Sequence, residues 1–190
     1  DKPLDQEVRL NKFKIYAARE FARVNGLNKI IFDSPTPRFG IITSGKAYLD
    51  VMQALEDIGI DSETAKSIGI RVYKVGMPWP LEPQKTHEFA EGLEEVFVVE
   101  EKHSLLETQL KKALYDTSDA KRPRIIAQHD ETGARILPIF PEYTPEDLSR
   151  VIAKRIAHFH TSDRIDARIR FIDARREADE KRNEMAVTRL

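Results

Sequence analysis

Strand-length apolar stretches alternate with amphipathic helical stretches between residues 38 and 160, and this order constrains the fold more than any other feature. The strand-like stretches are residues 39–43, 70–75, 95–99 and 124–128, and each is followed by a helical or turn-rich stretch. Strands that alternate with helices favour a mostly parallel sheet with right-handed crossovers and helices on both faces. We therefore predict a three-layer α/β domain with an open, mostly parallel sheet of about five strands.

The segments on either side of this region have a different character. Residues 4–25 carry apolar side chains at helical spacing, and prolines make residues 33–37 an extended connector. Residues 163–184 are mostly charged, with a thin isoleucine stripe, which predicts a linker helix or, equally, a solvated tail. The expected organisation is an N-terminal helix and connector (1–37), the α/β domain (38–160) and a charged linker helix (161–190).

Composition excludes several classes of site. The chain has 31 basic and 32 acidic residues, a net charge of −1, and so no overall field that would attract nucleic acid or an anionic membrane. It has no cysteine, so it cannot itself supply a thiolate nucleophile, a disulfide or cysteine ligands for an iron–sulfur cluster. It shows no membrane-length apolar run, no signal-type start and no initiator methionine, so we expect an internal piece of a cytoplasmic protein.

A small-residue loop joins the first predicted strand to its helix. The loop consists of Thr43, Ser44, Gly45 and Lys46, and the helix opens at Ala47. In open α/β sheets, ligands and partner surfaces meet the carboxyl ends of strands, where helix N–H groups carry partial positive charge. This loop is therefore a candidate interface or anion-binding loop.

The loop does not match the known nucleotide-binding motifs. Gly45-Lys46 with the upstream Gly40 imitates a phosphate-binding loop, but Ala47 replaces the Ser or Thr that would hold magnesium. No G-x-G-x-x-G motif follows any predicted strand, so a dinucleotide fingerprint is also missing.

Glu100 and Glu101, followed by Lys102 and His103, end the most hydrophobic strand and are the best acid–base candidates. Burial would shift their pKa values, but consecutive strand residues point to opposite faces and do not form a dyad. We favour a structural interpretation, in which a carboxylate bonds to the next helix or loop. That helix is predicted to begin with a capping box formed by Ser104 and Glu107.

Trp79 lies in a stiff, proline-rich loop after the second strand. We favour the interpretation that it closes the core, and the alternative is a binding loop that presents an aromatic ring.

His158 and His160 are two residues apart on a predicted helix and so face different sides, and the other histidines are isolated. No metal site is assigned.

Three blocks of sequence carry a family resemblance: GIITSGKAY at residues 40–48, VYKVGMPWPL at 72–81 and EEVFVVEE at 94–101. Their order and spacing resemble the central, transketolase C-terminal-like segment of indolepyruvate ferredoxin oxidoreductase, especially its long fused bacterial form. The resemblance covers about residues 10–160, and the charged tail is like the linker into the thiamine-diphosphate domain of that family.

The resemblance implies a specific role. The parent enzymes oxidatively decarboxylate arylpyruvates to aryl-acetyl-coenzyme A and pass electrons to ferredoxin, using thiamine diphosphate, magnesium and iron–sulfur clusters. The matching domain supports the catalytic domains and contributes to assembly with a partner subunit, in a protein expected to be a homo-oligomer. This implies no catalytic residue and no cofactor within the present chain, which alone would be inactive.

One alternative of a different class stays open. It is an independent small-molecule or anion-binding module, or a hydrolase, in which Lys46 holds an anion and Glu100 or Glu101 acts as base. Convergence of Ser44, Lys46 and Glu101 on an enclosed cleft would favour the alternative, whereas an open face with exposed apolar surface would favour the assembly domain.

Overall fold

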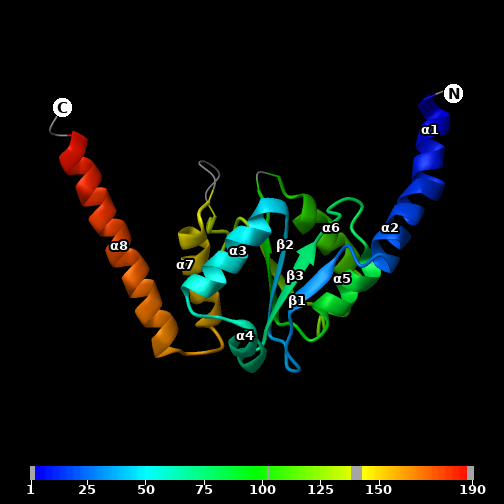
Figure 1. Cartoon of the computed structure of the whole chain (residues 1–190). Coiled ribbons are helices and arrows are strands. Elements are labelled where there is room, and N and C mark those ends of the chain that lie inside the picture. Colours follow the sequence, from blue (N-terminus) through cyan, green and yellow to red (C-terminus); the bar gives the residue numbers. More distant parts are fainter. Residues whose placement is uncertain (1–2, 102, 138–142, 188–190) are drawn as a thin grey trace.

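The computed structural model describes residues 3–101, 103–137 and 143–187 and shows a five-stranded sheet covered by helices on both faces (Figure 1). The strands lie in the order β1-β3-β2-β4-β5. The predicted three-layer α/β fold with a mostly parallel sheet is confirmed. The strand bounds are β1 Lys29–Phe32, β2 Phe39–Ser44, β3 Ile70–Val75, β4 Glu95–Val99 and β5 Arg124–Ile126.

Helices connect the strands and extend from both ends of the sheet domain. Some begin at side-chain caps: Asp61 accepts a hydrogen bond from the Thr64 N–H (2.8 Å), and Thr144 and Asp147 form a reciprocal capping box. The bounds are α1 Pro3–Arg9, the π-helical turn η1 Leu10–Lys14, α2 Ile15–Val24, α3 Gly45–Asp57, α4 Ser62–Ile68, α5 Pro83–Ala90, α6 Leu105–Leu114, α7 Pro145–Ile156 and α8 Asp163–Val187.

The strand register places the candidate loops at one edge of the sheet. The central strand β2 pairs in parallel with β3 on one side and β4 on the other, so that Thr43 lies opposite both Lys74 and Val99. The carboxyl ends of these strands, with the loops that follow them, therefore meet at one edge, called here the carboxyl edge.

The edge strand β1 corrects the sequence interpretation. Ile30, Ile31 and Phe32 fall in the segment 1–37 that the sequence assigns to the N-terminal helix and connector, but they belong to a strand that pairs antiparallel with β3. The run was too short to show a strand period, and its pairing with β3 is a long-range contact that local sequence does not encode.

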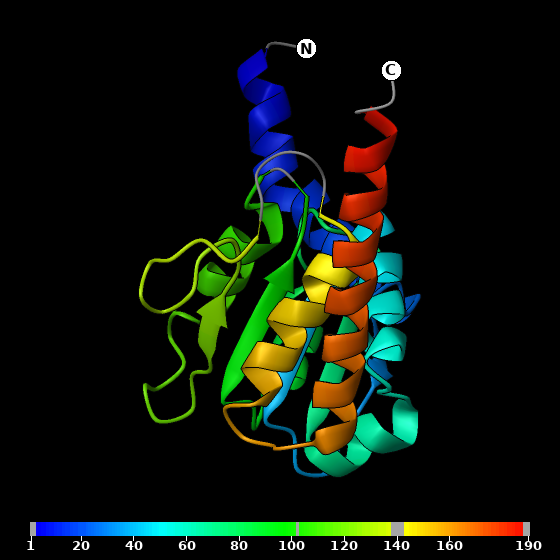
Figure 2. The ribbon, with the colours of Figure 1, turned by 90° about the vertical axis from the view of Figure 1, so that its left-hand side faces the viewer.

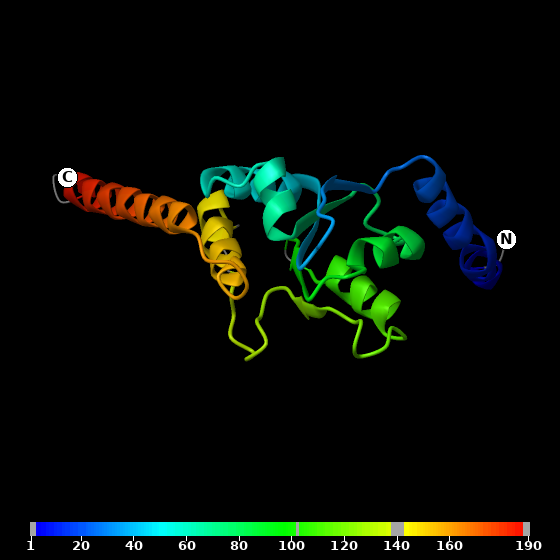
Figure 3. The same ribbon diagram turned by 90° about the horizontal axis from the view of Figure 1, so that it is seen from below.

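Helices lie on both faces of the sheet (Figure 3). An apolar cluster fills the layer on each face. One joins β2, β3 and β4 to α3, α4, α7 and the inner side of α8, and it includes Ile41, Leu55 and Ile152. The other joins the sheet to α5 and α6 through residues such as Phe89 and Leu110. Alternate strand residues supply the two clusters, as expected for a strand buried on both faces.

A buried ion-pair network holds the opposite edge of the sheet. The Arg155 guanidinium of α7 is only 3% exposed; its Nε donates to Glu95 (2.7 Å), a second nitrogen also bonds Glu95, and the third donates to Glu131 (2.9 Å). These bonds connect α7 to the start of β4 and to the segment after β5. The sequence also predicts a small hairpin here, with a turn at residues 130–133 that leads into residues 135–138. The antiparallel bridge between His129 and Arg135 agrees with it, and residue 138 lies outside the described residues.

Both terminal helices point toward the side of the carboxyl edge (Figures 1 and 2). The helical segment α1–η1–α2 (residues 3–24), called here the N-terminal arm, rises from β1, and α8 rises along α7. Ile165 and Ile172 of α8 are buried against the domain, so α8 packs on it through its isoleucine stripe. Beyond this contact α8 continues as a helix to Val187, and its residues 174–185 are exposed.

Candidate functional site

The loop between β2 and α3 has the predicted strand–loop–helix form. Ser44 ends β2 in an extended conformation, and Gly45 begins α3 with φ of +58°, a left-handed value that favours glycine. Ser44 makes no side-chain hydrogen bond to the helix backbone. Thr43 is fully buried, and its Oγ1 has no hydrogen-bond partner among the described residues.

Lys46 in the first turn of α3 is surrounded by carboxylates. Its Nζ lies 3.0 Å from Asp50 Oδ2 on the next turn and 3.7 Å from Glu101 Oε1 at the end of β4. The side chain of Lys46 is half exposed, whereas that of Asp50 is nearly buried. The ammonium charge is therefore already balanced by fixed carboxylates, which weakens any attraction for an anion.

Asp50 is the one member of this cluster that sequence analysis missed. The sequence could have predicted this contact, because Lys46 and Asp50 carry opposite charges four residues apart in a helix and so lie on the same face.

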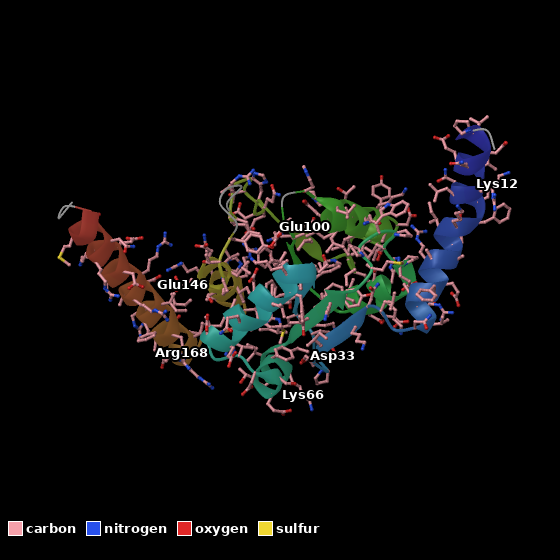
Figure 4. All side chains as sticks on the ribbon, turned by 45° about the horizontal axis from the view of Figure 1, so that its top comes forward. Lys12, Asp33, Lys66, Glu100, Glu146 and Arg168 are labelled. Atoms are coloured by element: carbon pink, nitrogen blue, oxygen red, sulfur yellow. The ribbon has the colours of Figure 1, made fainter. Side chains whose placement is uncertain are left out.

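Glu100 has a structural function at the same edge (Figure 4). Its carboxylate is buried and accepts hydrogen bonds from the backbone N–H groups of Leu106 (2.7 Å) and Glu107 (3.0 Å) in the first turn of α6. Burial raises the pKa of Glu100, against the opposing effect of these backbone bonds. The favoured interpretation, a carboxylate that bonds to the next helix, is confirmed for Glu100.

This contact corrects the predicted capping box at Ser104. Ser104 is the residue before α6 but makes no side-chain hydrogen bond to the helix backbone, because the Glu100 carboxylate already accepts from the first-turn N–H groups. Glu100 turns toward α6 and Glu101 toward α3, so the two adjacent acids diverge, as the strand period requires. Lys102, placed with them in the sequence, lies outside the described residues.

Trp79 is exposed, and the expectation that it closes the core is wrong. Half of its surface is accessible (51%), while the loop around it is fixed to α6: the Leu81 N–H donates to Gln109 Oε1 (2.8 Å), and Gln109 Nε2 donates to the Pro78 carbonyl (2.7 Å). Statistics on tryptophan burial favoured the core, but a side chain from α6 holds the loop instead. The structure therefore places an exposed aromatic ring on a held loop.

The described residues do not offer a metal centre. No group of three or more His, Asp or Glu side chains among them is arranged to hold an ion. In the same residues, no helix is both long and apolar enough to span a membrane.

An open hollow lies at the edge of the sheet opposite the carboxyl edge. It is an open groove of about 890 Å³ between the end of α5 and the segment after α6, with Leu93 and Leu114 at its base and His87, Glu91 and Lys121 among its walls. None of the residues predicted for the site lines it. Sequence analysis gave no signal for this groove, because its walls come from segments that only the tertiary fold brings together.

The structure is an open-sheet α/β domain, and at its carboxyl edge Glu100 bonds the start of α6 while Lys46 contacts Asp50 and Glu101. A family model for the indolepyruvate oxidoreductase domain matches residues 29–179. The chain belongs to this family, which confirms the resemblance predicted from the three sequence blocks.

Individual relatives agree with this assignment. Indolepyruvate oxidoreductase subunit IorA of Methanothermobacter marburgensis is 29% identical over 140 residues, covering 74% of this chain and 20% of that protein. Subunit IorA of Pyrococcus abyssi is 34% identical over 79 residues, covering 42% of this chain and 11% of that protein. The chain thus spans a fifth or less of the length of these relatives.

Solved structures give a more distant match. A 2-oxoglutarate:ferredoxin oxidoreductase from Magnetococcus marinus aligns with a TM-score of 0.46 and 18% identity, over 82% of this chain and 24% of that chain. A split-gene transketolase aligns with the same TM-score and 16% identity, over 70% of this chain and 43% of that chain.

Proposed function

We propose that this chain is a non-catalytic assembly domain of an indolepyruvate, or 2-oxoacid, ferredoxin oxidoreductase. The observation that carries the proposal is the use of the charged groups at the carboxyl edge: Glu100 caps α6, and Lys46 is balanced by Asp50 and Glu101. The charged site residues suggested by the sequence are therefore engaged in structure. The choice of parent enzyme in this proposal is supported by the family to which the chain belongs.

In the parent enzyme, we propose, an arylpyruvate is oxidatively decarboxylated to an aryl-acetyl-coenzyme A, and the electrons pass to ferredoxin in the cytoplasm. Thiamine diphosphate, magnesium and iron–sulfur clusters would then be held by other polypeptide, either flanking domains or a partner subunit. The present residues do not fit these groups, since the chain has no cysteine and its described acids and histidines form no ion-binding cluster. We derive no catalytic step for this chain.

Calorimetric titration of the purified chain tests the proposal directly. With magnesium present, we expect no saturable heat for thiamine diphosphate, coenzyme A or indolepyruvate, because the described site residues are engaged with one another. The matched assay for turnover uses indolepyruvate, coenzyme A and an artificial electron acceptor. Tight binding of thiamine diphosphate, or consumption of the keto acid by the chain alone, would reject the assembly role.

Substitution of Lys46 distinguishes the assembly role from the alternative, an anion-binding module. Because Lys46 is half exposed and its pairing is partly solvated, Lys46→Ala should change the free energy of unfolding by less than about 1 kcal/mol. The same substitution should weaken assembly, or the use of coenzyme A, in the parent enzyme if this loop meets a neighbour there. Urea unfolding measures the change in the free energy of unfolding, and size-exclusion chromatography measures the change in assembly.

Asp50→Asn is the matched control for this loop, because it removes the other member of the pair. If phosphate or pyrophosphate stabilises the wild type against urea, and Lys46→Ala abolishes that effect, the anion-binding module is correct and the assembly role of this loop is not. A large loss of stability in both Lys46→Ala and Asp50→Asn would instead show that the pair of Lys46 and Asp50 is structural.

A further inference from the structure

An open groove lies between α3 and α8, far from the loops of the candidate site. Two adjoining hollows of about 660 and 260 Å³ form it, and both are lined by Gln53, Glu56 and Arg168. The partly buried Phe32 and Met52 are among the apolar residues that line the larger hollow. We call the two hollows together the α3–α8 groove.

One face of α8 lines this groove with a regular row of side chains. The row consists of Arg164, Arg168, Phe171 and Arg175. Their spacing of four, three and four residues places them on the same face of the helix, over about 17 Å of its length. Phe171 in this row is 63% exposed, and Leu49 on the α3 side of the groove is 64% exposed. Each side of the groove therefore presents an uncovered apolar side chain.

The two walls of the groove carry opposite charges that do not pair with each other. Arg164, Arg168 and Arg175 form no ion pair with any residue that the structure describes. On the other wall, Glu56 of α3 and Glu146 at the start of α7 (Figure 4) likewise form none with the described part of the chain. The walls are therefore too far apart for direct ion pairs across the groove.

The charges along the groove nearly cancel. Asp57 and Asp61 also line it, but both are engaged: Asp57 accepts a hydrogen bond from Gln53 (2.9 Å), and Asp61 caps α4. With acids on one wall and arginines on the other, the groove favours neither a polyanion nor a polycation. Its occupant must carry charges of both signs on separate sides.

An amphipathic helix meets these requirements. A helix that lies along α8 repeats its own side chains every three or four residues, so it can reach each arginine of the row in turn. Its apolar stripe covers the exposed Leu49 and Phe171. Acidic residues on the flank toward α8 and basic residues on the flank toward α3 then pair with both walls.

The N-terminal arm exposes a longer apolar stripe, but its charges do not identify a partner. Phe13 and Phe21 are 66% and 58% exposed. Among the described residues of the arm, Ala22 alone is buried, on the side that meets the domain. Arg23, next to it in the chain, pairs with Glu20 of the same helix. The contacts of the arm do not show what covers its stripe, whereas the charged walls of the α3–α8 groove specify their partner.

We propose that the α3–α8 groove docks an amphipathic helix of a neighbouring polypeptide. The acidic flank of that helix faces the arginine row of α8, and its basic flank faces Glu56 and Glu146. Its apolar stripe lies against Leu49 and Phe171, which become buried on docking.

The inference rests on the proposed assembly role, because its occupant comes from neighbouring polypeptide, and the two fail separately. A groove that binds no helix does not affect the titrations with thiamine diphosphate, coenzyme A and indolepyruvate. A chain that binds thiamine diphosphate tightly rejects the assembly role, whatever its groove binds.

Fluorescence anisotropy with a labelled synthetic helix is the first test. The probe is a peptide of about 18 residues, with a leucine stripe flanked by glutamates on one side and by lysines on the other. We expect saturable binding to the full chain. Arg164→Glu together with Arg168→Glu should weaken it about tenfold, since two attractive contacts become repulsive. Arg170→Glu is the matched control, because Arg170 lies on the same helix but lines neither hollow. Circular dichroism verifies that each variant is folded.

A second peptide, with lysines on both flanks, tests direct contact with the arginines. The wild type should bind it more weakly than the first peptide, and the double variant should bind it more tightly than the wild type does. Equal losses of affinity for both peptides would refute direct contact.

Three further outcomes would overturn the proposal. They are the absence of saturable binding at millimolar peptide, an equal loss in the Arg170→Glu control, and self-association of the wild type that the double variant abolishes. Sedimentation equilibrium detects the last of these, which would assign the groove to a second copy of the chain.

Discussion

Arg155→Ala should destabilise the domain by about 3 kcal/mol, the largest effect we expect from a single substitution of a charged residue. The guanidinium is almost completely buried and bonds Glu95 and Glu131, so its removal leaves the Glu95 carboxylate partly buried without a counter-charge. The same change detaches α7 from the start of β4 at the edge opposite the candidate site. Urea unfolding followed by circular dichroism measures the loss.

A double-mutant cycle separates the ion pair from simple packing. Arg155→Met with Glu95→Gln removes both charges, so the double variant should be clearly more stable than the sum of the single losses predicts. Arg176→Ala is the control, because Arg176 pairs with Glu180 in solvent and should change stability little or not at all. Additive losses in the cycle would mean that Arg155 acts through its aliphatic stem alone.

Glu100→Ala should cost about 2 kcal/mol, because it leaves the N–H groups of Leu106 and Glu107 in the first turn of α6 without an acceptor. Ser104→Ala is the control, and it should have an effect below about 0.5 kcal/mol, since Ser104 does not cap the helix. Thermal and urea unfolding of the two variants compare the contact seen in the structure with the one expected from sequence. A larger loss for Ser104→Ala would contradict the assignment of the cap to Glu100.

The pH dependence of the unfolding free energy in Glu100→Gln is a second test of the role of Glu100. Burial raises the pKa of Glu100 in the folded state, so the folded protein binds this proton more tightly than the unfolded chain does. The contribution of this group to stability is therefore present in full below its unfolded pKa and is lost as pH rises through the folded pKa. The difference in unfolding free energy between wild type and Glu100→Gln should widen when the pH is lowered from 7 toward 4.5, and a narrowing difference would reverse the sign of the pKa shift.

The sequence predicted the layers of the fold well, because the patterns that mark strands and helix starts involve residues close together in the chain. The strands β2, β3 and β4 are apolar runs with clear boundaries, and the caps at Asp61 and Thr144 bond within a few residues of themselves. The structural function of Glu100 also followed from its position, since a carboxylate at a strand end precedes a helix N-terminus.

The errors on β1, Trp79 and the N-terminal arm depend on contacts between distant segments. Strand β1 exists because β3 offers an open edge, and the exposure of Trp79 depends on Gln109 of α6. The helical period of the N-terminal arm was predicted, but which of its sides would meet the domain was not. A helical period locates an apolar face without specifying what covers it.

The two outer strands set a limit on how this domain associates with other proteins. Strand β5 has three residues and begins with Arg124, and β1 has four and begins with Lys29, so each margin of the sheet is short and starts with a cation. Short margins with cationic residues discourage the addition of a foreign strand, the usual first step of amyloid-type aggregation. Recruitment of neighbours therefore falls to helices and loops, and the sheet can remain highly apolar inside without becoming a template for fibrils.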